Sequence, residues 1–322
     1  MRHLAVGGLI GFATLGQAAL AQDSTDFPTE PITLVVPFSA SGSPPNVLAR
    51  ELGQQMEEEW DQPTVVENRP GAAGQIAAQY VAGNEADGHT LLMGSVATQV
   101  IGPLMRDMPL DPAEAFVPVS QFGYTPMLIS ANADTGIESI EELVEQARAE
   151  PGSLSYMSVG VGSAAHLAAE MLQNVADIEL KHVPYDGIGQ AKLDLVSGEV
   201  DIGFSNIISM VQFIEEGSID PLAVTDTKRV DILPDVPAIA ETHPEGKVQL
   251  WWGLYAPSGT PDDVLDMLSA QVNEMVSGEE LVADFADGGA TLVGTSPEDL
   301  RELGQEDSKR WAEVIEAAGI GK

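Results

Sequence analysis

The stretch Pro31-Ile-Thr-Leu-Val-Val-Pro37 decides the fold. A short run made almost entirely of β-branched residues is typical of a strand that is covered on both faces, as strands in parallel sheets are. Over residues 44–59, apolar residues then recur at helical spacing, which predicts an amphipathic helix. A buried strand followed at once by such a helix is the repeating unit of an α/β fold.

The alternation of strands and helices forms two series along the chain. The predicted strands cover residues 31–37, 64–66, 90–93, 154–158, 181–183, 200–204 and 222–225. The predicted helices, which lie between or after these strands, cover residues 44–59, 71–84, 163–174, 188–197, 207–216, 261–276 and 297–318. Two such series on one chain favour two α/β domains, each with a mainly parallel sheet flanked by helices.

The length of 322 residues also favours two domains, because one hydrophobic core rarely covers a chain this long. We expect residues 22–120 and 226–322 to form lobe 1, and residues 121–225, inserted between them, to form lobe 2. The tracts 116–122 and 225–229 would then be the two hinge crossings. Clefts between domains are preferred ligand sites, so this arrangement predicts a site between the lobes.

The composition is strongly acidic, with 50 acidic and 14 basic side chains, a net charge of -36 and no cysteine. Phosphate binding needs clustered Lys and Arg, so nucleic acid is excluded as a partner and docking on anionic lipid is disfavoured. The lack of cysteine excludes disulfides, thiolate metal sites and a cysteine nucleophile. We interpret the charge as an acidic, halophile-like surface that stays hydrated in high salt. An acidic face for a cationic ligand is the alternative.

The N-terminus has the pattern of a secretory signal peptide. Met1-Arg2-His3 is basic, residues 4–15 are apolar and small, and Ala19-Leu20-Ala21 is a small-x-small cleavage site. The apolar stretch is shorter than the ~20 residues that a membrane-spanning helix needs. We therefore expect cleavage of residues 1–21, export across a bacterial inner membrane, and a mature periplasmic protein that does not insert into the membrane.

Three loops follow predicted strands, where ligands of open α/β sheets bind near helix N-termini. Residues 38–46 are crowded with small and hydroxyl side chains, which favours a ligand site over an ordinary tight turn. Residues 94–98 are a weak signal, because such a sequence is usually only a turn. Residues 160–166 contain Ser163, a natural N-cap, and His166 in the first helical turn. His166 either donates to a ligand carboxylate or packs inside the lobe, and the sequence leaves both open.

The motifs of common enzymes are missing. The sequence has no Gly-x-Ser-x-Gly elbow, His-Glu-x-x-His, Walker loop or complete Gly-x-Gly-x-x-Gly. The histidines show no metal-ligand spacing, so neither a metal nor a cofactor is expected. Adjacent acids such as Asp262 and Asp263 are typical of a helix N-terminus. We therefore expect a protein that is not an enzyme.

A set of motifs runs in order along the mature chain. The first are Pro31-Ile-Thr-Leu-Val-Val-Pro-Phe38, Ala49-Arg50, Val66-Glu-Asn-Arg-Pro-Gly-Ala-Ala-Gly74 and Asp87-Gly-His-Thr-Leu-Leu-Met-Gly-Ser95. The later ones are Phe116-Val-Pro-Val119, Pro151-Gly-Ser-Leu-Ser-Tyr156, Gly160-x-Gly-Ser-x-x-His-Leu167, His182-Val-Pro-Tyr-Asp-Gly187, Leu233-Pro-Asp-Val-Pro237 and Trp252-Gly-Leu-Tyr-Ala-Pro-Ser-Gly-Thr-Pro261. Together they resemble the solute-binding proteins of tripartite tricarboxylate transporters, also called the Bordetella uptake family.

The resemblance implies a two-lobed periplasmic binding protein, or Venus flytrap, that delivers a small organic carboxylate to the membrane subunits of a secondary transporter. We expect it to be a monomer. In the family, main-chain N–H groups and ordered water hold one carboxylate. By the resemblance, the ligand contacts from lobe 1 would be Phe38, Ser39, Ala40, Ser43, Ser95 and Thr98, with Asn46 as a further candidate. Those from lobe 2 would be Gly162, Ser163, His166, Tyr185, Phe204 and Ser205.

The loop after the first strand departs from the family pattern. The family usually has two adjacent glycines and then an aspartate before Ala-Arg, whereas this chain reads Ser41-Gly42-Ser43-Pro44-Pro45-Asn46. Asn46 stands at the place of the aspartate, the loop has one extra residue, and the two prolines remove two backbone donors. We therefore do not expect an amino-dicarboxylate. A dicarboxylate, a tricarboxylate, an aromatic acid and a nicotinate-like compound stay open.

Two other functions remain as alternatives. The first is a periplasmic hydrolase on the same scaffold, with Ser163 as nucleophile and His166 as base, although a spacing of three within one helical turn is poor geometry for that pair. The second is a ligand-binding partner of a sensor receptor, which the sequence does not separate from a transport protein.

Overall fold

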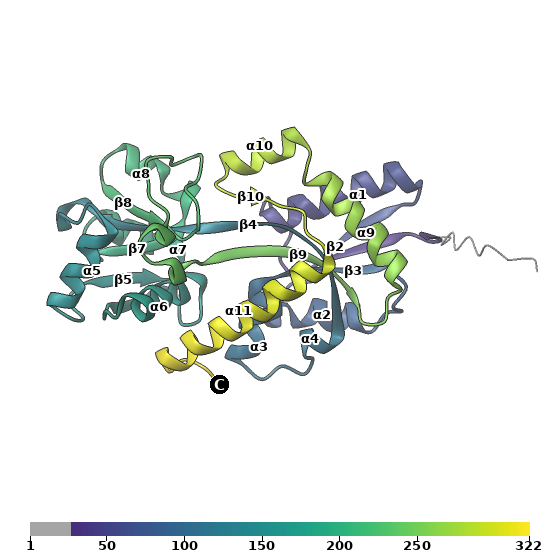
Figure 1. Ribbon diagram of the computed structural model, residues 1–322, viewed down its shortest axis with the longest axis horizontal. Coiled ribbons are helices and arrows are strands. Elements are labelled where there is room, and N and C mark those ends of the chain that lie inside the picture. The colour runs from purple at the N-terminus through teal and green to yellow at the C-terminus, as the bar shows by residue number, and fades with distance from the viewer. Residues whose placement is uncertain (1–26) are drawn as a thin grey trace, which may run out of the picture.

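The computed structural model describes residues 27–322, so the predicted signal peptide at residues 1–21 lies outside the described residues. Two lobes follow one another along the long axis of the molecule (Figure 1). Within the described residues, their strands join into one ten-stranded sheet, because β4 (Phe116–Asn132) runs through both lobes. The prediction of a two-lobed α/β fold with helices flanking the sheet is confirmed.

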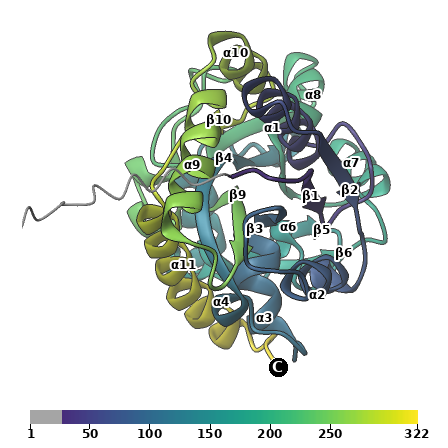
Figure 2. The same ribbon diagram turned by 90° about the vertical axis from the view of Figure 1, so that its right-hand side faces the viewer.

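Lobe 1 has the strand order β2-β1-β3-β9-β4 (Figure 2). β1 (Ile32–Val36) pairs in parallel with β2 (Thr64–Asn68) and with β3 (Thr90–Ser95). β9 (Gln249–Pro257) runs antiparallel between β3 and β4, and the short β10 (Thr291–Leu292) pairs antiparallel with β4. The parallel part of this sheet therefore consists of the three strands that the sequence predicts.

Helices cover both faces of the sheet in lobe 1, and α11 continues across to lobe 2 (Figure 1). A π-helical turn, η2 (Ala97–Ile101), leads from β3 into α3. The helices that pack on lobe 1 are α1 (Pro44–Trp60), α2 (Gln75–Ala82), α3 (Gly102–Met105), α4 (Pro112–Ala115), α9 (Asp262–Met275), α10 (Glu279–Asp287) and α11 (Pro297–Ala318).

The first strand is covered on both faces, as its β-branched run predicts. Ile32, Leu34 and Val36 are fully buried in a core cluster with apolar residues of α1 and α9. Val35 points to the opposite face and is fully buried in a second cluster with residues of α2 and α11. Because side chains alternate along a strand, one short segment contributes to both cores.

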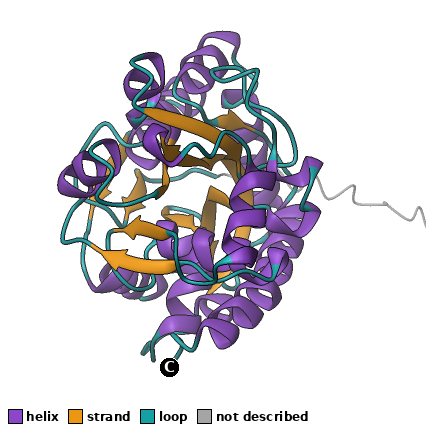
Figure 3. Cartoon of the chain, turned by 90° about the vertical axis from the view of Figure 1, so that its left-hand side faces the viewer, coloured by secondary structure: helices purple, strands orange, loops and turns teal. Residues whose placement is uncertain are grey.

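Lobe 2 repeats the plan of lobe 1, with the strand order β6-β5-β7-β4 and with β8 also paired to β4. Its strands are β5 (Ser155–Ser158), β6 (Lys181–Pro184), β7 (Ile202–Asn206) and β8 (Ile219–Val224). β5 pairs in parallel with β6 and β7, whereas β4 is antiparallel to β7 and β8. Helices surround these strands (Figure 3); they are α5 (Ile140–Ala149), α6 (Ala164–Ala176), α7 (Ile188–Val196) and α8 (Val211–Glu215).

The hinge consists of two neighbouring chain segments. Pro126 in β4 pairs with Gln249 at the start of β9, so the outgoing and returning chains cross side by side. Next to them, the buried Thr225 accepts a hydrogen bond from Met127 N (2.8 Å) through Oγ1 and donates one to Val248 O (2.7 Å). Thr225 thereby ties both crossings to the end of β8.

The lobe borders at residues 120 and 225 stay a prediction. The segment 226–248 packs on lobe 2, because Val230, Val236 and Ala238 belong to the same core cluster as Leu128 of β4. This packing favours placing the return crossing at residues 248–249 rather than at residues 225–229.

The C-terminal helix α11 packs on both lobes. It contacts β4 and η2 in lobe 1 and α6 in lobe 2. Near its middle, the carboxylate of Asp307, which is 3% exposed, accepts hydrogen bonds from Trp251 Nε1 (2.7 Å) and from Arg310 (2.6 Å). Arg310 also donates to Lys247 O (2.9 Å), so this buried network fastens α11 to the start of β9, beside the hinge.

The strand β9 and the helices α5 and α10 are not among the predicted elements. β9 reads Gln249-Leu-Trp-Trp-Gly-Leu-Tyr-Ala-Pro257, which lacks the alternation of a half-buried strand because neighbours cover both of its faces. None of the helices in residues 27–322 is long and apolar enough to cross a membrane.

Candidate functional site

A pocket of about 180 Å³ lies at the end of lobe 2 where its parallel strands finish. Residues from the carboxyl ends of β5 and β7 line it, together with the first turns of α6 and α7. Two predicted ligand contacts, Phe204 and Ser205, are among the lining residues, and both are buried. This is the place at which open α/β sheets bind ligands, between strand ends and helix N-termini.

Gly162 and Ser163 lie in the loop that leads from this pocket into α6. Ser163 is the N-cap of α6, and its Oγ accepts a hydrogen bond from His166 N (3.3 Å), as the sequence predicts for a cap. Gly162 has a φ of +77°, and a Cβ at this position would lie 2.8 Å from Met105 Cε in α3. The loop therefore lies against Met105 of lobe 1, and the positive φ at residue 162 favours glycine.

His166 is packed inside lobe 2 rather than pointing to a ligand. It is 3% exposed, its Nδ1 accepts a hydrogen bond from Gly162 N (3.0 Å), and its Nε2 lies 3.5 Å from Glu170. Its ring stacks on His182 with the ring centroids 4.2 Å apart, and His182 stacks in turn on the buried Tyr156. The structure thus favours the packed alternative, in which His166 holds the loop at residue 162 in place.

The stacked histidines are held in their neutral forms. Burial, followed by the nearby charge of His166, lowers the pKa of His182 from 6.5 to about 4. Burial also lowers the pKa of His166, against an opposing effect of Glu170. Because a proton on either ring would be poorly solvated and would face the other ring, the folded lobe binds protons less readily than the unfolded chain.

This stack predicts a loss of stability in mild acid. Between pH 6.5 and about pH 4, the unfolded chain takes up protons that folded His182 refuses, so the free energy of unfolding falls as the pH falls. His182→Phe keeps an aromatic ring in the stack but cannot be protonated, so its unfolding midpoint should change less over the same range. Urea unfolding of both proteins at several pH values measures the difference. If the free energy of unfolding changes equally with pH in both proteins, His182 is not the source of the acid sensitivity.

Tyr185, the remaining predicted contact in lobe 2, is engaged with α7. Its hydroxyl donates to Asp194 Oδ2 (2.9 Å), and burial together with this bond raises the pKa of Tyr185 to about 12. The side chain therefore supports α7 beside the pocket and is not among the residues that line the pocket.

The predicted contacts Phe38, Ser39, Ala40 and Ser43 lie in the loop between β1 and α1. Phe38 and Ser43 are half-buried, whereas Ser39 and Ala40 are exposed. The loop is held from inside by Asn46. Ser39 and Ala40 are the exposed residues of the predicted lobe 1 site, and the contact of this loop with a ligand stays a prediction.

Asn46 is fully buried and its side chain is saturated with hydrogen bonds. Its Nδ2 donates to Ser39 O (3.2 Å) and to Ser43 Oγ (3.0 Å), and its Oδ1 accepts from Asn68 Nδ2 (2.7 Å). Asn68 Nδ2 also donates to Phe38 O (2.8 Å). Asn46 therefore fixes the loop and has no polar atom left for a ligand.

Ser95 and Thr98 are buried and bonded to each other at the start of η2. Ser95 N donates to Thr98 Oγ1 (3.0 Å), and Thr98 N donates to Ser95 Oγ (3.3 Å). A Cβ on Gly74, which has a φ of +91°, would lie 2.6 Å from Thr98 Cγ2, so the loop after β2 packs closely on this pair. Their hydroxyls mainly stabilise the end of β3.

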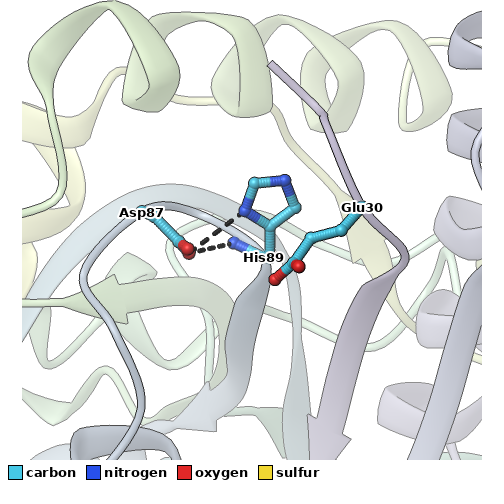
Figure 4. Close-up of side chains that lie close together, drawn as sticks. All are labelled: Glu30, Asp87 and His89. Carbon is cyan, nitrogen blue, oxygen red and sulfur yellow. Dashed lines mark hydrogen bonds and ion pairs between the residues drawn. The ribbon is translucent and has the colours of Figure 1, made fainter. Parts of the chain in front are cut away.

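A group of ionisable side chains lies at the opposite end of lobe 1, before β1 and β3. Figure 4 shows Glu30, Asp87 and His89 close together, with ligand atoms within 4.8 Å of one another. His89 Nε2 accepts from Thr29 N (3.1 Å), so its Nδ1 carries the proton and lies 3.1 Å from Asp87 Oδ1. Through the bond from Thr29 N to its Nε2, His89 fastens the chain before β1 to β3, and we assign it a structural role. Its Nδ1 lies near Asp87 but makes no hydrogen bond within the described residues.

Several residues that line the pocket were not predicted as contacts. Ala164, Ala165 and Ile188 come from the first turns of α6 and α7, and Met127 and Met157 form part of the wall. Ile188 is 46% exposed, and an apolar side chain at the first position of a predicted helix is a sequence signal that could have indicated it. Met127 and Met157 reach the pocket because β4 and β5 both pair with β7. The hydrophobic periodicity of the sequence does not reveal this pairing.

Comparison with known proteins gives a consistent result. The family model "Tripartite tricarboxylate transporter family receptor" (TctC) matches residues 48–320. The Bordetella pertussis protein BugT is 34% identical over 321 residues, covering 99% of this chain and 98% of its own length.

Two solved structures from Rhodopseudomonas palustris also match. Rpa4515 with adipate has a TM-score of 0.73 and 34% identity, covering 92% of this chain and 99% of its own. MatC with bound malate has a TM-score of 0.69 and 30% identity, covering 90% of this chain and all of its own.

Proposed function

Because this chain belongs to the TctC family of tripartite tricarboxylate transporter receptors, we propose that it is a periplasmic binding protein for a small organic carboxylate. In this proposal, the signal peptide at residues 1–21 directs export, and the mature protein works as a monomer. It delivers its ligand to the membrane subunits of a tripartite tricarboxylate-type secondary transporter.

The observation that carries the proposal is the chemistry of the pocket in lobe 2. Two helix N-termini border it, none of its lining residues is acidic, and it lies at the strand ends. First-turn N–H groups have no acceptor within their own helix and carry a partial positive charge, which suits a carboxylate. Rpa4515 and MatC, whose solved structures hold adipate and malate, support the same class of ligand.

The two-lobed architecture supports coupling of binding to closure of the lobes. The hinge is a pair of adjacent strand crossings, and the loop at Gly162 lies against α3 of lobe 1. A ligand that contacts both lobes stabilises the closed form by its difference in affinity for the two forms. A membrane partner that recognises the closed form would then receive only the loaded protein.

The geometry gives no support to the hydrolase alternative. Ser163 Oγ accepts a hydrogen bond from the main-chain N–H of His166, and the His166 ring contacts Gly162 and Glu170 instead of Ser163. A serine nucleophile needs a base within hydrogen-bond reach of its hydroxyl.

A thermal-shift screen of carboxylates with residues 22–322 in high salt tests the proposed function. A true ligand at a hundredfold excess over its dissociation constant should add about 2.7 kcal/mol to the free energy of unfolding. That corresponds to a rise in melting temperature of several degrees. Calorimetry should then give one site per chain and an unchanged ligand after incubation. If no carboxylate raises the melting temperature, or if the ligand is converted, the proposal is wrong.

A further inference from the structure

A second cavity, of about 260 Å³, lies between α11 and the sheet of lobe 1. Figures 1 and 2 show α11 and α4 side by side, and the walls of the cavity come from these two helices, η2, the start of β4 and the end of β9. The cavity shares no lining residue with the pocket in lobe 2, and none of the predicted ligand contacts lines it. The name "α11 pocket" below means this cavity beneath residues 300–308 of α11.

Tyr255 of β9 brings a buried hydroxyl without a partner to the α11 pocket. The residue is 6% exposed and lines the pocket, and within residues 27–322 its hydroxyl makes no hydrogen bond. Burial, together with the nearby charge of Asp307, raises the pKa of Tyr255, so the phenol keeps its proton and is a donor. A buried hydroxyl without a partner is costly because it loses its hydrogen bonds to water on folding. A molecule in the pocket that offers an acceptor would remove this cost.

The ring of Tyr255 lies on the face of the sheet that α11 covers. Gly94 of β3 pairs directly with Gly253 of β9. A Cβ on Gly94 would lie 2.6 Å from Tyr255 Cδ2. A Cβ on Gly253 would lie 3.3 Å from Tyr255 Cε2 and 2.7 Å from Leu300 Cδ2 in α11. The two glycines therefore leave room for the ring between the sheet and α11, and the phenol is held under the helix.

A glycine in the interior of α11 leaves the roof of the pocket open. Gly304 lines the pocket and lies inside a helix of 22 residues, where glycine costs stability compared with alanine. A Cβ at this position would have no neighbouring atom within 4 Å, so close packing does not explain the glycine. The open space beside Gly304 is therefore part of the pocket, and a larger side chain there would occupy it.

The charges around the α11 pocket favour an uncharged molecule. None of the described residues that line it is acidic, although the chain has 50 acidic residues. Arg301 lines it, but its exposed guanidinium is already paired with Glu298 of the same helix. Asp307, one position before the lining residue Ser308, is buried, and its charge acts on Tyr255. An anion bonded to Tyr255 would meet the same charge at low dielectric, and a cation would find no carboxylate among the lining residues.

The walls of the α11 pocket fit a compact apolar body. Val100, Phe116 and Leu300 are buried apolar residues from η2, β4 and α11. Pro118, which pairs with Tyr255, also lines the pocket. At about 30 Å³ for each water-sized group, a volume of about 260 Å³ holds about nine such groups, which fits a six-membered ring with a short substituent.

From the unpartnered phenol, the open roof and the charges, we propose that the α11 pocket is a second ligand site. Its ligand is a small uncharged molecule with a compact apolar body and one hydrogen-bond acceptor, which Tyr255 binds through its hydroxyl. This inference goes beyond the proposed function, because the carboxylate of that proposal binds at lobe 2, and neither site depends on the other.

Fluorine NMR of three matched probes mixed with the protein tests the site and its chemistry. The probes are 4-fluoroacetophenone, a ketone with an uncharged acceptor, 4-fluorobenzoate, an anion of similar shape, and 4-fluorotoluene, which lacks the carbonyl. The ketone should bind most tightly, and fluorotoluene should bind about threefold to tenfold more weakly because it makes no hydrogen bond to the phenol. At the α11 pocket, fluorobenzoate should bind at least about tenfold more weakly than the ketone, because its charge would be buried there.

Three variants assign the binding to the α11 pocket. Gly304→Leu occupies the pocket and should remove binding of the ketone, yet it should melt no lower than the parent, because leucine forms helix better than glycine. Tyr255→Phe keeps the ring and loses only the hydroxyl, so it should bind the ketone about threefold to tenfold more weakly and fluorotoluene like the parent. Tyr80→Phe is the matched control, because it removes a hydroxyl from α2 of lobe 1 outside the pocket and should bind all three probes like the parent.

The outcomes separate this inference from the proposed function. Loss of ketone binding in Gly304→Leu, together with weaker binding in Tyr255→Phe, supports the second site. The inference falls if the ketone does not bind the parent, if it binds Gly304→Leu as tightly as the parent, or if Tyr255→Phe weakens the ketone no more than fluorotoluene. Tighter binding of fluorobenzoate than of the ketone, where Gly304→Leu removes both, would also overturn it. A carboxylate that binds at lobe 2 should raise the melting temperature of Gly304→Leu as it does that of the parent, so the proposed function stands or falls on its own screen.

Discussion

Replacing Asp307 with alanine should lower the free energy of unfolding by about 3–5 kcal/mol, because it removes one partner of a buried ion pair. The carboxylate is 3% exposed and accepts hydrogen bonds from the indole of Trp251 and from Arg310. Without it, the fully buried indole N–H of Trp251 loses its partner, and the partly buried guanidinium of Arg310 loses its counter-charge and keeps only Lys247 O. A buried charge left unpaired costs far more than an exposed ion pair contributes.

The loss should also reach beyond α11, because this helix packs on both lobes. Urea unfolding followed by tryptophan fluorescence measures it, since Trp251 and Trp311 are both buried near the changed residue. Glu306→Ala is the matched control: it removes a negative charge from the neighbouring, exposed position and should change stability by no more than about 0.5 kcal/mol. If the two variants are equally stable, the network does not fasten the helix.

Replacing Asn46 with aspartate should cost about 3 kcal/mol at pH 7, even though aspartate is the residue that the family resemblance places here. The side chain is fully buried, and its Nδ2 donates to Ser39 O and Ser43 Oγ. A carboxylate cannot donate, so a charged oxygen would face the carbonyl oxygen of Ser39 at close range. The loop of this chain, with its two prolines, is therefore built around an amide.

The cost of Asn46→Asp should depend on pH. Burial would raise the pKa of the new carboxyl in the folded protein above its unfolded value of about 3.9. The deficit in stability should therefore be small near pH 4, where the folded carboxyl is protonated and the unfolded one is only about half ionised. It should grow as the pH rises towards the folded-state pKa.

The matched control for this substitution is Asn84→Asp. Asn84 is exposed, and its Nδ2 also donates to a carbonyl, Tyr80 O (2.7 Å), so the chemical change and the change in net charge are the same. Water can solvate the new carboxylate there, and a loss of less than about 1 kcal/mol is expected. A deficit at Asn46 that does not vary between pH 4 and pH 7 would show that the buried charge is not its cause.

These two residues also differ in how far the sequence could reveal them. Asp307 belongs to a helix that the sequence predicts. The chain has 50 acidic residues, however, and nothing in the sequence distinguishes Asp307 as the one that is buried. Asn46 was recognisable as a departure from the family loop, and it was interpreted as a candidate ligand contact. Its burial and its bond to Asn68 assign it instead to the support of the loop.

The sequence alone determined the two α/β series, the strand at residues 31–37 with both faces covered, the helix that follows it, and the family. These features follow from local rules, because hydrophobic period and turn residues are properties of neighbouring positions. Only the tertiary structure decided the path of β9 and the packing of α11 across the lobes. It also packed His166 against His182 and, within residues 27–322, left the hydroxyl of Ser205 without a hydrogen-bond partner.

The physical reason is the distance in sequence between the partners. Asp307 meets Trp251, and Thr225 meets Met127, only after the chain has crossed between the lobes and returned. Whether a buried polar side chain forms all of its hydrogen bonds depends on such distant partners. The pattern of neighbouring residues does not predict them. The helix beginning at Pro44 could be predicted from its own residues, but the buried partners of Asp307 and of Asn46 could not.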